Sequence, residues 1–173
     1  VADAMAGRLQ TRYRADSFPC LESTPRPRRD LLQIPRAKRF EHINLYFLQT
    51  TRGCPFRCSF CAVTSVLGGK LRHRPVSEVE AEIESLGIRR LQRGQKRDRF
   101  HDIVFFTDDN IVGHRSYAKD LLRMVATFNL KWVGQASTNV ADDAEILALL
   151  RDSGCMGLAV GFETLSQKNI RDV

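Results

Sequence analysis

The sequence predicts an α/β fold in which helices cover a parallel sheet, and two features of the chain predict it. Short apolar segments without polar interruption alternate with longer segments in which apolar residues recur every three or four positions. The short segments are typical of strands buried on both faces of a parallel sheet, and the longer ones of helices that cover it. Four such strand–helix units follow one another along the chain.

The predicted strands are apolar and rich in β-branched or aromatic residues. They cover residues 43–50, 102–107, 131–137 and 156–162. Polar or acidic side chains follow each strand. Because the loops at the carboxyl ends of parallel strands converge in β/α barrels, we expect a site at these strand ends.

Helical periodicity separates the first two strands. A helix is predicted to begin near Ser77, which forms an S-x-x-E capping box with Glu80. Its buried stripe is predicted to contain Val79, Ile83 and Leu86.

Further helices follow the next strands. One covers roughly residues 114–128 and places Tyr117, Ala118, Leu121, Leu122 and Val125 on one face. Another begins at a second capping pair, Asp142 and Glu145, and ends before Gly154 at its C′ position. A last helix is expected to start near Ser166.

Residues 1–40 show no regular period. They hold four of the six prolines and many arginines, so we predict a connector that lies along the next domain, with residues 31–34 docking as a short turn. Residues 41–173 form the predicted core domain. Cys20 lies alone in the connector and is predicted to be an idle thiol.

The composition favours a soluble globular protein over a membrane protein. Apolar residues make up 43% of the chain and charged residues 27%, and no apolar run approaches the roughly 18–20 residues of a membrane span. The start has neither an initiator Met nor the layout of a signal peptide. We therefore expect a piece of a larger cytoplasmic protein.

The net charge of +7 raises the question of nucleic-acid binding. Much of the charge lies in two basic runs, residues 26–29 and 89–99. No aromatic residues interleave with the basic ones, as a base-stacking surface would require. Solvated connectors are therefore the favoured interpretation of both runs.

Three cysteines gather in one short segment directly after the first strand. Cys54, Cys58 and Cys61 form a C-x3-C-x2-C pattern, and Gly53 and Pro55 predict a tight loop. Thiolates are the usual ligands of iron–sulfur clusters, and a 4Fe–4S cluster normally takes four of them. A loop that offers three would leave one iron open to a small molecule.

Two other interpretations of the thiols stay open at this point. Zinc would need a fourth ligand, for which His73 is available, although the spacing is not a common zinc pattern. A disulfide is disfavoured because nothing marks the chain as secreted and five cysteines cannot all pair. Cys155 is predicted to be a small buried hydrophobe.

The cysteine pattern, with an aromatic residue before its last cysteine, resembles the signature loop of the radical S-adenosylmethionine (SAM) superfamily. In that family the three cysteines hold three irons of a 4Fe–4S cluster, SAM chelates the fourth, and the aromatic residue lies against the adenine. The resemblance assigns Cys54, Cys58 and Cys61 to the metal and Phe60 to SAM. It also implies a (β/α)6 partial barrel, of which about four of six units are present, so that the core is truncated at its C-terminus.

The resemblance implies further SAM contacts at the other strand ends. Asp108 and Asp109 occupy the place of a Gly-Gly-Glu-like motif that binds the SAM amino group, although this chain has Thr-Asp-Asp-Asn there. Glu163 falls near the region that contacts the ribose in the family. Gln135 and Ser137 are weaker candidates at the end of the third strand.

The activity that the resemblance implies is reductive cleavage of SAM to a 5′-deoxyadenosyl radical, which abstracts a hydrogen atom. The electron donor would be of the flavodoxin or ferredoxin type, and the substrate a small or lipid-like molecule. The string T-T-R-G-C-P-F-R-C-S-F-C resembles the branch whose barrel follows a cobalamin-binding domain, which implies methyl transfer. The cobalamin-ligating D-x-H-x-x-G pattern is absent from the sequence, so such a domain is expected upstream of residue 1.

Two alternatives from other classes and one from the same superfamily accompany this interpretation. One is a zinc-stabilised RNA-binding module that uses the basic runs. Another is an iron–sulfur electron carrier without SAM chemistry. The third, within the same superfamily, is an enzyme similar to the methylthiotransferases that modify RNA.

Overall fold

The computed structural model describes residues 1–31, 43–98 and 101–166. Within these ranges a four-stranded sheet has the order β1-β4-β5-β6, and every neighbouring pair is parallel. The strands are β1 (Asn44–Leu48), β4 (Asp102–Phe106), β5 (Lys131–Ala136) and β6 (Cys155–Val160). The predicted α/β fold is confirmed, because a parallel sheet in chain order requires the helical crossovers that the sequence pattern indicates.

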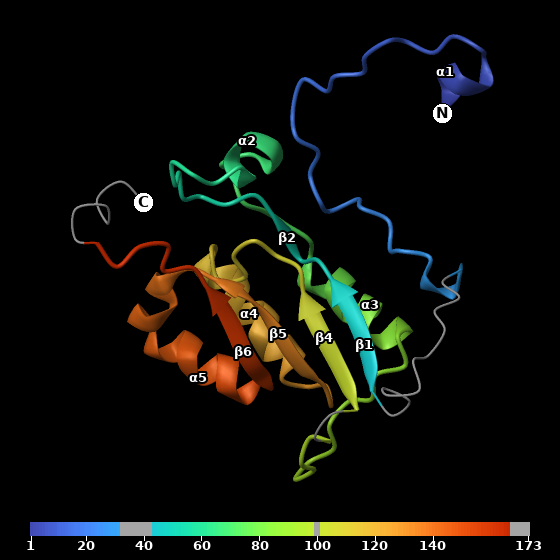
Figure 1. Cartoon of the computed structure of the whole chain (residues 1–173). Coiled ribbons are helices and arrows are strands. Elements are labelled where there is room, and N and C mark those ends of the chain that lie inside the picture. The colour runs from blue at the N-terminus through green and yellow to red at the C-terminus, as the bar shows by residue number, and fades with distance from the viewer. Residues whose placement is uncertain (32–42, 99–100, 167–173) are drawn as a thin grey trace.

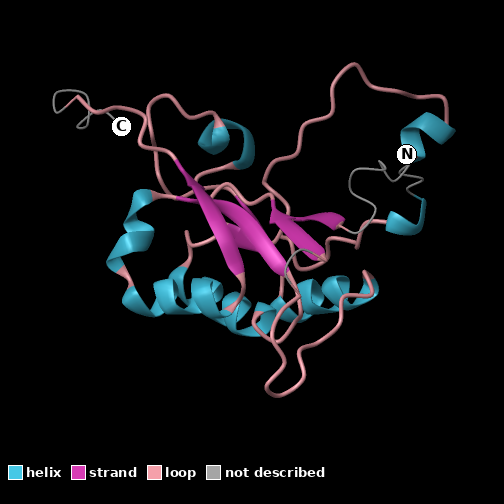
Figure 2. Ribbon diagram, turned by 60° about the horizontal axis from the view of Figure 1, so that its bottom comes forward, coloured by secondary structure: helices cyan, strands magenta, loops and turns pink. Residues whose placement is uncertain are grey.

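Three helices cover one face of this sheet, and among the described residues no helical layer covers the other face (Figures 1 and 2). The helices are α3 (Val76–Ser85), α4 (Arg115–Val125) and α5 (Ala144–Asp152). Phe106 and Trp132 point into this helical side and meet edge to face with ring centroids 5.3 Å apart. On β1, Leu45 and Phe47 are each 54% exposed, as expected of the inner wall of a partial barrel.

The predicted buried stripes of the helices are confirmed. Val79 and Ile83 are fully buried on α3, whereas Leu86 forms the C-cap of that helix and is partly buried. All five residues predicted for the apolar face of the second helix are buried on α4. Gly154 follows the end of α5 with φ +88°, in the left-handed region that the C′ position favours.

Both predicted capping pairs are wrong. The helix α3 begins at Val76 after Pro75, and no side chain caps it, because Ser77 already lies inside the first turn. Glu80 bonds Arg90 at 2.7 Å instead. The N-cap position is held by Pro75, whose side chain has no acceptor for the free N–H groups of the first turn.

The second correction concerns the start of α5. Asp143, and not Asp142, is the N-cap, and its Oδ1 accepts a hydrogen bond from the Ile146 N–H at 3.0 Å. The short helix η3 (Thr138–Asp142) ends at Asp142 and leaves only the next residue extended. Glu145 bonds Lys119 and Arg123 across the surface of α4.

Smaller elements lie around this core. A hairpin of β2 (Thr51–Arg52) and β3 (Arg72–His73) follows β1, and α2 (Val63–Leu67) lies between its strands. The N-terminal segment contains α1 (Ala2–Met5) and η1 (Arg29–Leu31). Its first part, with α1, arcs away from the sheet (Figure 1), and the part that leads to η1 returns to the core.

Two ion pairs connect this N-terminal segment to α3. Arg26 pairs with Glu78 at 3.3 Å and Arg29 with Glu82 at 2.6 Å.

No helix in the described ranges is long and apolar enough to cross a membrane. The predicted turn over residues 31–34 and the last predicted helix fall mostly outside the described residues.

The N-cap assignment gives a stability prediction. Replacing Asp143 with Ala should lower the free energy of unfolding by about 1 kcal/mol, because the Ile146 N–H loses its acceptor at the start of α5. Urea denaturation followed by circular dichroism measures this change. The neighbouring Asp142→Ala variant is the matched control and should stay within about 0.5 kcal/mol of the parent. Equal losses in the two variants would contradict the assignment.

Candidate functional site

The cysteine loop leaves the carboxyl end of β1 and is closed at its base by a hairpin. Thr51 and Arg52 of β2 pair with His73 and Arg72 of β3, so the two ends of residues 53–71 are held together. The loop and α2 lie beyond the carboxyl ends of the sheet strands (Figure 1). The predicted placement of the thiols at a strand end is therefore present in the structure.

Gly53 is required where the chain enters this loop. Its φ is +90°, and a Cβ on it would lie 2.7 Å from the carbonyl oxygens of both Gly68 and Lys70. The Cys54 N–H donates to the Gly68 carbonyl at 3.4 Å. The first cysteine is thus held against the far side of its own loop by a backbone approach that only glycine permits.

The three cysteines of the motif are unpaired thiols. Cys54, Cys58 and Cys61 are all partly buried, and none forms a disulfide. The Cys61 N–H donates to the Cys58 carbonyl at 3.1 Å, which turns the chain between these two residues. Across the described ranges, no three Cys, His, Asp or Glu side chains converge in a metal-ligating arrangement. The assignment of the three thiols to a metal stays a prediction.

Cys54 lies beside Asn110, which follows the end of β4. Burial raises the pKa of its thiol above the usual value, while hydrogen bonds from the Phe56 backbone and the Asn110 side chain act in the opposite direction. Repulsion from Cys58 and Cys61 raises this pKa further. The side chain of Asn110, at the end of β4, therefore belongs to the surroundings of the cysteine loop.

The residues at the end of β4 divide into three different environments. Asp108 is fully buried, and its carboxylate accepts hydrogen bonds from the backbone N–H groups and the hydroxyls of Thr50 and Thr51. Burial raises the pKa of Asp108, and these donors oppose that rise. Asp108 is therefore the poorer candidate for the predicted SAM contact, because it is fully buried and its Oδ1 already accepts from the chain itself.

Asp109 has the free acceptor that the prediction requires. Its Oδ2 is buried and has no hydrogen-bond partner among the described residues. Burial raises the pKa of this carboxyl group. A buried carboxylate oxygen without a donor is costly unless a ligand supplies one, so Asp109 is the better candidate of the two aspartates for the predicted ammonium contact.

Asn110 connects the ends of β4 and β5. Its Nδ2 donates to Ser137 Oγ at 3.0 Å, and Ser137 donates in turn to Asn139 Oδ1 at 2.6 Å. Ser137 is thereby committed to this network. Gln135 is exposed at the end of β5, and its carbonyl accepts from the Ile111 N–H at 3.0 Å. The structure leaves the side chain of Gln135 accessible.

The last two predicted SAM residues are exposed. Phe60 lies on the cysteine loop and is 56% exposed. Glu163 follows β6 and is the one non-glycine residue with positive φ in the described ranges, at +50°. Both side chains are accessible to a ligand, and neither role is tested by these positions.

The histidines have structural environments. His73 stacks on Tyr117 with centroids 4.3 Å apart and meets His114 edge to face. The His114 ring accepts from the Tyr117 N–H at 3.3 Å and so caps α4. Cys155 is partly buried and packs against the core, as predicted for a small hydrophobe.

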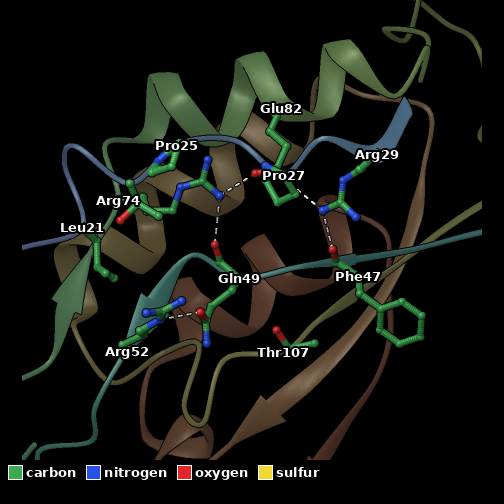
Figure 3. A pocket seen from close by; sticks show the side chains of 11 residues that line it. Leu21, Pro25, Pro27, Arg29, Phe47, Gln49, Arg52, Arg74, Glu82 and Thr107 are labelled. Carbon is green, nitrogen blue, oxygen red and sulfur yellow. Dashed lines mark hydrogen bonds and ion pairs between the residues drawn. The ribbon is translucent and has the colours of Figure 1, made fainter. Parts of the chain in front are cut away.

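A polar hollow lies beneath the N-terminal segment, next to the ends of β1 and β4 (Figure 3). Glu82 is buried there and pairs with Arg74 and Arg29, while Arg74 also donates to the Gln49 carbonyl at 3.1 Å. Arg52 donates to the Gln49 side chain at 2.6 Å. Sequence reasoning missed this network, although Glu82 falls on the buried side of α3 between Val79 and Ile83, where an acidic residue indicates an ion pair.

Comparisons with known proteins define the class of this chain. The family model of the radical SAM superfamily matches residues 48–173, and the chain belongs to this superfamily. The prediction made from the cysteine motif is confirmed.

Particular relatives narrow the comparison. The chain is 30% identical over 165 residues to bacteriochlorophyllide d C-12(1)-methyltransferase of Chlorobaculum tepidum. This match covers 95% of this chain and 34% of the relative. It is 32% identical over 127 residues to cytidylyl-2-hydroxyethylphosphonate methyltransferase of Streptomyces wedmorensis, covering 73% of this chain and 22% of the relative. The chain thus spans about a third or less of these relatives' lengths.

A solved structure has the same fold. It is the radical SAM methyltransferase TsrM of Kitasatospora setae with cobalamin and a 4Fe–4S cluster bound. The TM-score is 0.59 at 24% sequence identity, and the match covers 73% of this chain and 24% of TsrM. The similarity supports the partial-barrel assignment of the sheet and its helices.

The entrance to the cysteine loop gives a testable prediction. Gly53→Ala should lower the free energy of unfolding by about 1–3 kcal/mol, because the new Cβ needs left-handed backbone and meets two carbonyl oxygens. Urea denaturation measures the change. Gly69→Ala is the matched control on the same loop, since a Cβ there meets nothing within 4 Å. Two variants of equal stability would show that the close approach at Gly53 is absent.

Proposed function

We propose that this chain is the cluster- and SAM-binding part of a radical SAM methyltransferase. The observation that carries the proposal is the set of three unpaired thiols on one hairpin-closed loop, in a chain of this superfamily. When bound to Cys54, Cys58 and Cys61, a reduced 4Fe–4S cluster supplies the electron for reductive cleavage of SAM. The protein's own contribution is to hold the cluster, to orient SAM against it and to shield both from water.

The residues around the loop fit these ligands chemically. Thiolates are the donors that iron–sulfur clusters take, and the loop offers three of them. The free Oδ2 of Asp109 is an acceptor for the ammonium group of SAM. The exposed ring of Phe60 offers an apolar surface to the adenine, and Glu163 and Gln135 are accessible acceptors for the ribose hydroxyls.

Cobalamin-linked methyl transfer is the reaction that we propose for the whole protein. The names of the relatives describe methyltransferases, and the solved TsrM structure contains cobalamin. The sequence lacks the D-x-H-x-x-G pattern, so we assign cobalamin to a part of the protein outside these 173 residues. The methyl acceptor would be a small or lipid-like molecule.

The remaining assignments follow from this activity. A flavodoxin- or ferredoxin-type protein would reduce the cluster, and the cytoplasm is the compartment in which an exposed cluster loop is stable. We retain the division into a connector, residues 1–40, and a core, residues 41–173. The two ion pairs from the connector to α3 support a connector that lies along the core.

The basic runs do not favour the RNA-binding alternatives. Arg89 pairs with Asp98, and Arg90 pairs with acidic residues of α3 and lies over the Phe128 ring. Arg97 donates to the Ala126 carbonyl at 2.8 Å. Arg90 and Arg97 hold the loop to the core and Arg89 pairs within the loop, which leaves fewer guanidinium groups for phosphates.

The ligand assignment predicts which thiols carry iron. Replacing any one of Cys54, Cys58 or Cys61 with Ala should reduce bound iron and sulfide severalfold after anaerobic reconstitution, because a cluster on two thiolates is poorly held. Cys20→Ala and Cys155→Ala are the matched controls and should keep the iron of the parent. Metal analysis also tests zinc. Loss of iron on replacing Cys155, with retention on replacing Cys54, would overturn the assignment.

The aromatic residue of the loop has a separate expected role. Phe60→Ala should keep the iron and weaken SAM binding by about tenfold, because a stacking surface worth roughly 1–2 kcal/mol is removed. Equilibrium dialysis with labelled SAM measures the dissociation constant. Phe56→Ala, on the same loop and 39% exposed, is the control and should bind SAM as the parent does. Equal weakening in both variants would argue against a specific contact at Phe60.

A further inference from the structure

The Asp108 carboxylate has an unusual set of partners. Its Oδ1 accepts from the Thr50 N–H at 3.0 Å, the Thr50 hydroxyl at 2.8 Å and the Thr51 hydroxyl at 2.6 Å, and also from the Thr51 N–H. Its Oδ2 lies 3.2 Å from the Thr50 nitrogen. All three residues are buried, with exposed fractions of 0%, 0% and 1%. Every donor belongs to the two residues that lead from β1 into the cysteine loop.

A carboxylate suits this position for a simple chemical reason. An ionised carboxylate only accepts hydrogen bonds, whereas an asparagine amide of the same size would turn an NH₂ group toward donors on at least one side. Hydrogen bonds to a charged acceptor are also the stronger ones. An asparagine at this position would turn its NH₂ group toward the Thr50 N–H, which lies 3.2 Å from Oδ2, and would lose the charge of the acceptor, so it would hold the junction between β1 and β2 less tightly.

The position of this junction matters for the neighbouring residues. Thr51 is three residues before Cys54, and Asp108 is directly followed by Asp109, whose free oxygen is the proposed acceptor for SAM. The Arg74 N–H donates to the Thr50 carbonyl at 2.9 Å and fixes the returning strand to the same point. The spacing between the cysteine loop and the end of β4 is thus set at Asp108.

We propose that Asp108 is a positioning residue, which holds Thr50 and Thr51 so that the cysteine loop and Asp109 bind SAM together. This inference rests on the proposed function. In this proposal Asp108 contacts neither the cluster nor SAM. Asp108 positions the chain, whereas the adjacent Asp109 accepts from SAM.

The test compares SAM affinity with folding stability in reconstituted protein. Asp108→Asn should lower the affinity for SAM about tenfold and shift the reduction potential of the cluster, because the loop loses its fixed distance from Asp109. Ser153→Ala is the matched control. Ser153 is equally buried, bonds Trp132 Nε1 at 3.1 Å, and lies at the opposite end of the sheet. This control should lower the urea midpoint without changing SAM affinity or potential.

A milder pair of variants covers the case in which Asp108→Asn does not fold. Thr51→Val removes one hydroxyl donor and keeps the shape of the side chain, and should weaken SAM binding severalfold, whereas Thr51→Ser should restore it. Parent-like SAM affinity in Asp108→Asn or Thr51→Val, or equal weakening in Ser153→Ala, would overturn the inference. A parent protein that binds neither iron nor SAM would instead refute the proposed function.

Discussion

The buried carboxylate of Asp108 ties the end of β1 to the end of β4, and the position of the cysteine loop depends on that tie. The loop has little regular structure of its own, apart from the short helix α2. It is held at its base by the β2–β3 pairing, by the passage of the chain at Gly53, and by the hydrogen bonds of Thr50 and Thr51. A loop with few internal contacts can present three thiols in a fixed place only if its two ends are fixed.

The sheet and its helices provide the rigid support for these ends. Phe106 and Trp132 are buried in one core with the apolar residues of α3, α4 and α5, and the polar residues begin where β4 and β5 leave this core. Three consecutive residues then take three tasks. Asp108 holds the chain, Asp109 keeps an oxygen free, and Asn110 reaches Ser137. The buried anchor at Asp108 and the proposed SAM acceptor at Asp109 are thus adjacent in the chain.

Much of the fold and the cysteine loop could be predicted, because strand–helix alternation and the C-x3-C-x2-C spacing are local properties of the sequence. The buried face of α4 followed from its periodicity alone. The capping residues could not be assigned, since two adjacent aspartates are equivalent until η3 fixes where α5 begins. The opposite environments of Asp108 and Asp109 were also unpredictable, because they depend on Thr50 and Thr51, which lie nearly sixty residues away in the chain. The same holds for Glu82 and its two arginines.

The most direct test of the account is electron paramagnetic resonance of the anaerobically reconstituted and dithionite-reduced protein, recorded with and without SAM. A cluster held by three thiolates of one loop, with its fourth iron open to SAM, would give a reduced 4Fe–4S signal whose shape changes when SAM is added, and this is the result that the account predicts. A signal that is identical with and without SAM would contradict a SAM site beside Asp109 and Phe60. One zinc per chain and no cluster signal would contradict the iron assignment of Cys54, Cys58 and Cys61 itself.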